Sequence, residues 1–177
     1  DHVLVIIQLS GGNDGMNMVI PVADYSNYFN ARSNIAIPQN RVLGITGVNG
    51  TGWHPSMTGL QSLFAEGKAK LVQAVGYPQP NFSHFRATDI WMSASNSNQE
   101  VYTGWTGRYL NYEFPNFPNN YPNPDAPDPL AIQIGSTTTL TTQGPVVNMG
   151  MSITNPTTFY NLVSGVTDPV PNTPAGK

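Results

Sequence analysis

A continuous apolar run near the start of the chain limits the folds open to it. Residues 3–9 read Val-Leu-Val-Ile-Ile-Gln-Leu, and Gly11 and Gly12 follow shortly after. A strand that is half exposed alternates apolar and polar side chains, whereas an unbroken apolar run is typical of a strand covered on both faces of a parallel sheet. The sequence therefore predicts a buried central strand over residues 3–9.

The segments that follow alternate between helix and strand patterns. Apolar residues at three- and four-residue spacing predict a helix over residues 55–66, and a second apolar run predicts a strand over residues 70–77. Strand, helix and strand joined by long crossovers indicate an α/β fold, doubly wound around a mostly parallel sheet. Further along we expect helices over residues 84–93 and 105–112, a strand over 130–135, a polar hairpin tip over 137–144, a segment over 146–153 that pairs back, and a last helix from Pro156 to about Val163.

The length of 177 residues corresponds to one domain. We expect residues 1–165 to form the N-terminal part of one α/β domain, with an insertion at about residues 114–129, where six prolines exclude regular structure. Residues 166–177 are rich in proline and are expected to be a linker or loop that leads to an absent C-terminal part. Because the chain opens at Asp1 and enters a strand pattern at once, we also expect that a targeting segment has been removed upstream.

Charged residues are scarce, and this excludes several functions. The chain has 7 Lys and Arg, 10 Asp and Glu, a net charge of −3 and no cysteine. Without a basic cluster, binding to nucleic acid or to an anionic membrane is disfavoured, and no apolar run approaches the ~20 residues of a membrane helix. The absence of cysteine excludes a disulfide framework and a thiolate nucleophile. The uncharged polar, turn-rich composition favours a secreted or periplasmic protein.

The loop after the first predicted strand is the first candidate site. Residues 10–17 read Ser-Gly-Gly-Asn-Asp-Gly-Met-Asn. Ligands of open α/β sheets bind at the carboxyl ends of strands, and glycines there let the backbone approach a ligand closely. Asp14 is therefore placed for a metal or a phosphate-like group. The alternative is that Gly, Asn and Asp simply form a turn.

The second candidate site follows the predicted strand over residues 70–77, so it is expected at the same sheet rim as Asp14. Ser83 precedes a predicted helix, where free amides and the helix dipole favour an alkoxide nucleophile or a bound oxyanion. His84 is a candidate proton carrier and Arg86 a candidate anion clamp. The alternative makes Ser83 an ordinary helix N-cap and His84 a packing residue.

Three further features have structural interpretations first. His54 is interpreted as a cap or packing residue, and Arg108 as a structural hydrogen-bond donor. Aromatic residues over 102–109 and 114–121 are of the kind that stack on sugar rings, but such residues more often hold a proline-rich loop against the core.

Several short blocks occur in a fixed order and resemble one family. Together they are similar to the bacterial secreted family known as domain of unknown function fifteen hundred and one, which belongs to the alkaline phosphatase and sulfatase superfamily. The resemblance runs from about Val3 to Ile153. The blocks are Ile-Gln-Leu-Ser-Gly-Gly-Asn-Asp-Gly-Met-Asn (7–17), Trp-His-Pro (53–55), Gln-Ala-Val-Gly-Tyr-Pro (73–78), Asn-Phe-Ser-His-Phe-Arg (81–86), Asp-Ile-Trp (89–91), Gly-Trp-Thr-Gly-Arg-Tyr-Leu (104–110) and Asp-Pro-Leu-Ala-Ile-Gln-Ile-Gly (128–135).

The resemblance implies a doubly wound α/β fold of the alkaline phosphatase and sulfatase type, exported through the twin-arginine route. It also implies descent from metal-dependent phospho- or sulfo-ester hydrolases, although activity in the family is largely unassigned. By the superfamily pattern, Asp14 with Asn13 beside it would ligate a divalent metal such as zinc, calcium or magnesium. Ser83 would be the nucleophile, and the substrate a small ester or a glycan.

The chain departs from the family in length and in histidines. Family members are roughly twice as long, and their later Asp-Thr-His and Thr-Asp-His-Gly segments have no counterpart here. The chain holds three histidines, His2, His54 and His84, so a closed two-metal site of the superfamily type cannot be built from it alone. We therefore expect an N-terminal piece that is inactive by itself and whose partner is the C-terminal remainder of the same protein.

Two alternatives to a hydrolase come from other classes. A non-catalytic surface or assembly protein that keeps the fold would agree with the aromatic, proline-rich and asparagine-rich composition. A serine esterase of the Gly-Asp-Ser-Leu type shares a Gly-x-Asn-Asp block, but its Gly-Asp-Ser and Asp-x-x-His blocks are absent.

Overall fold

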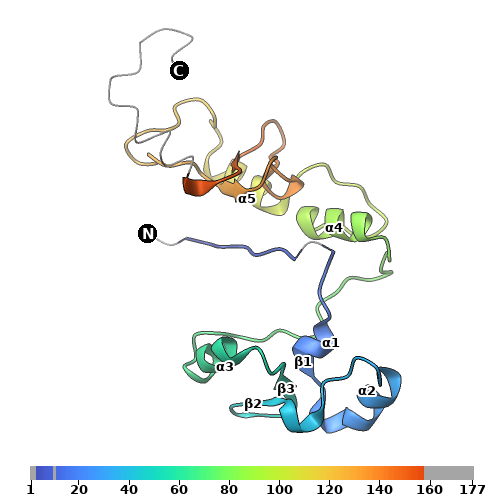
Figure 1. The fold of residues 1–177 in the computed structure, drawn as a ribbon. Helices are drawn as coiled ribbons and strands as arrows, with labels where there is room; N and C mark the ends of the chain where they lie inside the picture. The colour runs from blue at the N-terminus through green and yellow to red at the C-terminus, as the bar shows by residue number, and fades with distance from the viewer. Residues whose placement is uncertain (1–2, 10, 158–177) are drawn as a thin grey trace. The chain divides into compact units, whose positions relative to one another are not determined.

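The computed structural model describes residues 3–9 and 11–157 and is shown in Figure 1. These residues form two compact units that divide between Val75 and Gly76, and each unit is described by itself. The predicted helix from Pro156 lies mostly outside the described residues. The expectation of one α/β domain over residues 1–165 stays a prediction.

The first unit is built on a small antiparallel sheet. Its strands are β1 (Val19–Ile20), β2 (Leu43–Ile45) and β3 (Val48–Trp53), in the order β1-β3-β2. The turn between β2 and β3 holds Gly47 at φ +73°, a left-handed conformation that glycine adopts without a steric cost. None of these three strands is predicted from the sequence.

Short helices accompany this sheet. They are α1 (Gly15–Met18), α2 (Tyr25–Ala31) and α3 (Thr58–Ala65), with 3₁₀ turns η1 (Val22–Asp24) and η2 (Gln39–Arg41) between them. The buried apolar side chains are Ile20, Tyr28, Ile45 and Trp53. The rings of Trp53 and of Phe64 in α3 pack edge to face, with their centroids 5.8 Å apart.

Helix α3 confirms the helix predicted over residues 55–66, but it begins three residues later. The backbone N–H of Met57 donates to the His54 carbonyl at 2.9 Å, and the N–H of Ser56 donates to Nδ1 of His54 at 3.1 Å. A turn closed by His54 therefore takes the place of the first helical turn. His54 therefore caps this turn and not α3, whose N-cap is Met57.

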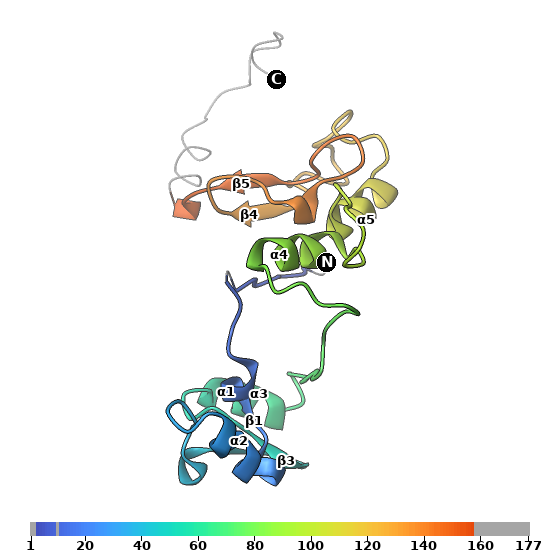
Figure 2. The same ribbon diagram turned by 90° about the vertical axis from the view of Figure 1, so that its right-hand side faces the viewer.

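The second unit contains two helices and a pair of short strands. These are α4 (His84–Ser93), α5 (Trp105–Glu113), β4 (Ile132–Ile134), the 3₁₀ turn η3 (Leu140–Thr142) and β5 (Met151–Ile153). Figure 2 shows β4 and β5 side by side, and they pair in parallel with Ile132 opposite Met151. Both helices are confirmed, and so is a strand within residues 130–135.

Two details of the second unit differ from the sequence prediction. Residues 137–144 do not form a hairpin tip, because the Gln143 N–H donates to the Leu140 carbonyl and closes η3. Residues 146–153 pair back in part, because Asn148 forms an antiparallel bridge with Gln143, whereas β5 pairs in parallel with β4. Residues 114–129 contain neither helix nor strand, as their prolines predict.

The strands predicted over residues 3–9 and 70–77 are wrong, since neither segment is a strand in the structure. Most of their apolar side chains are exposed, with Val3 at 86% and Val72 at 75% of full exposure, whereas Leu71 is half-buried. A strand requires a neighbour that completes its backbone hydrogen bonds, and neither segment has one within the described part of the chain. The doubly wound parallel sheet, built on these two strands, stays a prediction.

Helix α5 packs closely against η3 through two glycines. A Cβ at Gly104 would overlap the carbonyls of Leu140 and Thr141, and one at Gly107 would overlap the backbone of Gln143. The close approach also lets the Gly104 N–H donate to the Gln143 carbonyl at 2.8 Å. These two glycines therefore set the distance between α5 and η3.

Replacing Gly107 with alanine should destabilise the chain, because the new methyl group meets backbone atoms that cannot rotate away. Overpacking of this kind costs about 1–3 kcal/mol. Gly59→Ala in α3 is the matched control, since no atom lies within 4 Å of its added Cβ, and it should leave stability unchanged or raise it by up to ~1 kcal/mol. Urea unfolding measures both variants, and equal stability would contradict the close packing.

Candidate functional site

Asp14 lies at the N-cap of α1 and forms an ion pair with Arg32. Nη1 of Arg32 donates to Oδ1 of Asp14 at 2.7 Å, and Nη2 donates to Oδ2 at 2.5 Å. Oδ1 also accepts from the Asn17 N–H at 3.3 Å. The Arg32 hydrogen bonds are the main reason that the pKa of Asp14 lies below its ordinary value. Both carboxylate oxygens are therefore engaged by groups of this chain.

The ion pair belongs to a wider network in the first unit. Asn17 donates through Nδ2 to the Ile35 carbonyl at 2.9 Å and accepts at Oδ1 from the Tyr28 hydroxyl at 2.6 Å. The same hydroxyl accepts from the Ile37 N–H at 2.7 Å. The loop before α1 is thereby tied to α2 and to the segment that follows α2.

The side chains of the two predicted metal ligands, Asn13 and Asp14, are engaged by other groups of this chain. The Asn13 side-chain amide faces the sulfur of Met18, and Arg32 occupies the Asp14 carboxylate. Within residues 3–9 and 11–157, no three His, Asp or Glu side chains gather in a way that could hold a metal ion. A divalent cation at Asp14 would compete with a guanidinium of the same sign for the carboxylate oxygens, and the role of Asn13 and Asp14 as metal ligands stays a prediction.

Ser83 is the N-cap of α4, as the sequence predicts. Its Oγ accepts from the Arg86 N–H at 3.5 Å, and its own N–H donates to Oδ1 of Asn81 at 2.9 Å. The Tyr77 hydroxyl in turn contacts the backbone of Asn81 at 3.3 Å. Local hydrogen bonds thus fix the turn into α4, and the Ser83 side chain stays exposed.

His84 and Arg86 occupy the first turn of α4 and differ in their surroundings. His84 is exposed, and its carbonyl accepts from the Thr88 hydroxyl. Arg86 directs Nη2 at the carbonyls of Asn96, Ser97 and Gln99. This guanidinium holds the loop after α4, so its predicted role as an anion clamp would compete with three carbonyl contacts.

Arg108 and the aromatic residues of the proline-rich insertion have structural roles. Arg108 donates to the Thr103 carbonyl at 2.8 Å and to the Ser93 carbonyl at 2.7 Å, in agreement with its interpretation as a structural donor. The centroid of the Tyr121 ring lies 5.7 Å from that of Phe114 and 5.8 Å from that of Phe117. This cluster holds residues 114–121 together.

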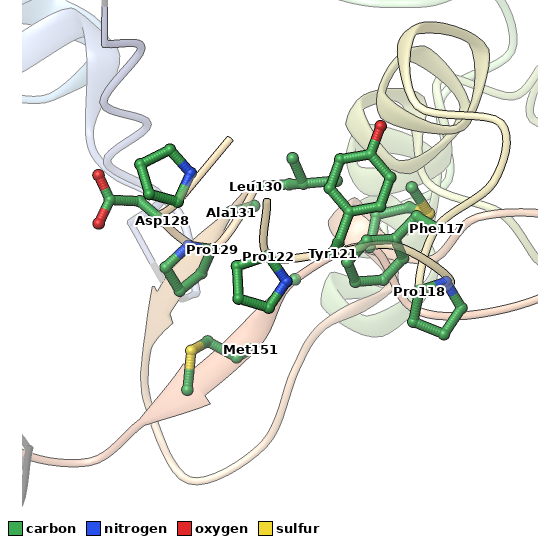
Figure 3. Close-up of a pocket in the computed structure, with 12 residues that line it drawn as sticks. Phe117, Pro118, Tyr121, Pro122, Asp128, Pro129, Leu130, Ala131 and Met151 are labelled. Atoms are coloured by element: carbon green, nitrogen blue, oxygen red, sulfur yellow. The ribbon is translucent and has the colours of Figure 1, made fainter. Parts of the chain in front are cut away.

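A pocket of about 410 Å³ lies beside this cluster and was missed by sequence analysis. Figure 3 shows Phe117 and Tyr121 at the right and Pro129 at the left, with Pro122 between them and Met151 below. The carboxylate of Asp128 points away from Tyr121 and Met151 in this view. The pocket is apolar, and its lining residues come from segments about thirty positions apart, so no local pattern could have revealed it.

The predicted site residues divide between the two units. Asn13 and Asp14 belong to the first unit, whereas Ser83, His84 and Arg86 belong to the second. The predicted position of Asp14 and Ser83 at one sheet rim therefore stays a prediction. Arg32, the partner of Asp14, carries no sequence signal because it follows Asp14 by 18 positions at the end of a short helix.

Comparisons with protein-family models, with curated proteins and with solved structures find no match. In the described part of the chain, no helix has the length and apolar character required to cross a membrane.

The Asp14 ion pair predicts a specific dependence of stability on pH. Because Arg32 lowers the pKa of Asp14, the carboxylate contributes its full stabilisation above the pKa of ~3.9 that it has in an unfolded chain, and this contribution is lost as the pH falls through the lower folded value. Urea unfolding of the parent and of Asp14→Asn should therefore differ by a constant amount from pH 7 to about pH 5, and the difference should shrink below pH 4. A difference that persists unchanged at pH 3 would contradict this assignment.

Arg86→Gln should loosen the loop over residues 96–99, because it removes the guanidinium that the three carbonyls share. Losing a charged donor of this kind costs about 1–3 kcal/mol. Hydrogen exchange of the loop amides should become faster, and the midpoint of urea unfolding should fall. Arg41→Gln is the control, because Arg41 is exposed and its substitution removes the same charge. Equal hydrogen-exchange rates of the loop amides in the two variants would show that the carbonyl contacts do not hold the loop.

Proposed function

We propose that this chain is the N-terminal portion of a secreted protein of the alkaline phosphatase and sulfatase type, in which Ser83 is the nucleophile of a phospho- or sulfo-ester hydrolase. The observation that carries the proposal is the position of Ser83, an exposed hydroxyl at the N-terminus of the ten-residue helix α4. Seven sequence blocks in family order, including the one that holds Ser83, support the same proposal.

The local chemistry supports Ser83 as a nucleophile. Within the described residues its Oγ accepts one long hydrogen bond, from the Arg86 N–H at 3.5 Å, and donates none, so the hydroxyl hydrogen is available to a base. Free backbone amides and the positive end of the helix dipole stabilise the negative charge that develops on an attacking oxygen or on a bound oxyanion. The exposed imidazole of His84, the next residue, is the candidate proton carrier.

The metal that the resemblance implies has a weaker basis in this chain. The Asp14 carboxylate is held by Arg32, and no step of the reaction is assigned to a metal at that position. Ligands for such a metal would have to come from the C-terminal remainder that we propose as the partner of this chain.

A second candidate function is a non-catalytic surface or assembly protein that keeps the fold without the chemistry. The ion pair favours it, because Asp14 serves as a cap and an Arg32 partner. Ser83 also caps a helix, and Arg86 holds a loop. In this function all three side chains would stabilise the fold, and none would touch a substrate.

The Ser83 proposal predicts that Ser83→Ala in the complete protein containing this chain abolishes hydrolysis while the fold is largely kept. Loss of an N-cap costs only ~1 kcal/mol, whereas loss of the hydroxyl removes the covalent route. Release of nitrophenol from p-nitrophenyl phosphate and p-nitrophenyl sulfate, in buffers with and without added zinc, calcium or magnesium, measures activity.

Ser83→Asn separates the two functions, because asparagine caps a helix as well as serine does but has no hydroxyl. Under the hydrolase proposal this variant should be as stable as the parent and inactive. Turnover at the parent rate by either Ser83 variant would exclude Ser83 as the nucleophile. A parent protein that hydrolyses neither ester under any of the metal conditions would favour the assembly function.

A further inference from the structure

Arg32 has a constrained position that the proposed function does not use. It is the C-cap of α2, where its N–H donates to the Phe29 carbonyl at 3.2 Å. Its own carbonyl accepts from the N–H groups of Ile35 at 2.9 Å and of Ala36 at 2.8 Å. The backbone of Arg32 is therefore fixed on both sides, and its side chain is only 20% exposed, against 41% for Asp14.

We propose that the Arg32 guanidinium is the resident cation of the glycine-rich loop: it holds the Asp14 carboxylate in the place where a divalent metal would otherwise bind. The role of Asp14 is then to anchor the glycine-rich loop to Arg32, rather than to ligate a metal. The proposal does not depend on whether Ser83 is a nucleophile, so the two can fail separately.

The geometry of the pair supports this assignment. A guanidinium presents two parallel N–H groups that match the two oxygens of a carboxylate, and the contacts at 2.7 and 2.5 Å use one nitrogen on each oxygen. A calcium or magnesium ion would need to lie ~2.0–2.6 Å from the same oxygens. The ion and the guanidinium carry charge of the same sign and would compete for the same two carboxylate oxygens.

The surrounding contacts explain what the resident cation would do. Asp14 accepts from the Asn17 N–H, and Asn17 in turn bonds to Tyr28, whose side chain is 2% exposed. Arg32 thus connects the loop before α1 to the far end of α2, while Asn17 and Tyr28 connect them through the core. A fixed cation supplied by the chain would keep the loop ordered without any dependence on metal supply.

A double-mutant cycle combined with metal titration tests the proposal on the whole chain. The variants are Asp14→Asn, Arg32→Gln and the double variant, each followed by thermal unfolding in chelator and then with calcium, magnesium or zinc chloride alone. We expect each single variant to lower the unfolding midpoint, and the double variant to lower it by no more than the larger of the two single effects, because both remove the same interaction. Any change that an added metal causes in the unfolding midpoint should be the same in the parent and in Asp14→Asn.

A second measurement keeps the test decisive if a variant fails to fold. In the parent protein, the ¹H–¹⁵N resonances of the Arg32 guanidinium should be resolved and protected, and they should not change when 1 mM calcium, magnesium or zinc is added at ~0.1 M salt. The thermal unfolding midpoint of Arg32→Lys should lie between those of Arg32→Gln and the parent, because an ammonium group cannot match both carboxylate oxygens.

Two results would overturn the proposal. The first is stabilisation of the parent by a metal that disappears in Asp14→Asn, since it would make Asp14 a ligand. The second is additive loss in the double variant, since it would show that Asp14 and Arg32 act independently.

Discussion

The need of each backbone N–H and C=O group for a partner governs this structure. The first unit meets it with an antiparallel sheet in which β3 pairs with both β1 and β2. The second unit meets it with the parallel pair of β4 and β5 and with the contact between α5 and η3. Residues 3–9 form no strand within the described part of the chain, although the segment is strongly apolar.

Polar side chains complete what these short elements leave open. The buried apolar core is small, with Ile20, Tyr28, Ile45 and Trp53 in the first unit and Ile90 and Met149 in the second. Around it, arginines bridge segments: Arg32 reaches a loop ahead of its helix, Arg86 the loop after α4, and Arg108 the end of α4. A chain with few charged residues therefore uses three of its arginines to fix its own loops.

The sequence predicted best the features that depend on neighbouring residues. Helix α4 and its Ser83 cap follow from a local pattern of a capping residue before an amphipathic stretch, and both are confirmed. The strands over residues 3–9 and 70–77 failed because burial requires distant partners that an apolar run cannot specify. The glycine-rich loop drew attention to Asp14 in the sequence. Its contact with Arg32, 18 positions away, has no local sequence pattern that could have predicted it. The pocket beside Tyr121 joins segments that only the folded chain brings together.

The exposed segment over residues 3–9 also bears on how the protein behaves in concentrated solution. It is a run of seven residues without a charge or a proline, and its apolar side chains are 51% exposed or more. Proteins usually protect such stretches with lysine or proline, because open backbone groups beside β-branched side chains recruit further chains. A net charge of −3 adds little long-range repulsion between copies, and that repulsion weakens as acidification brings the net charge toward zero. This segment should therefore lower colloidal stability, and its effect should grow with concentration and toward mildly acidic pH.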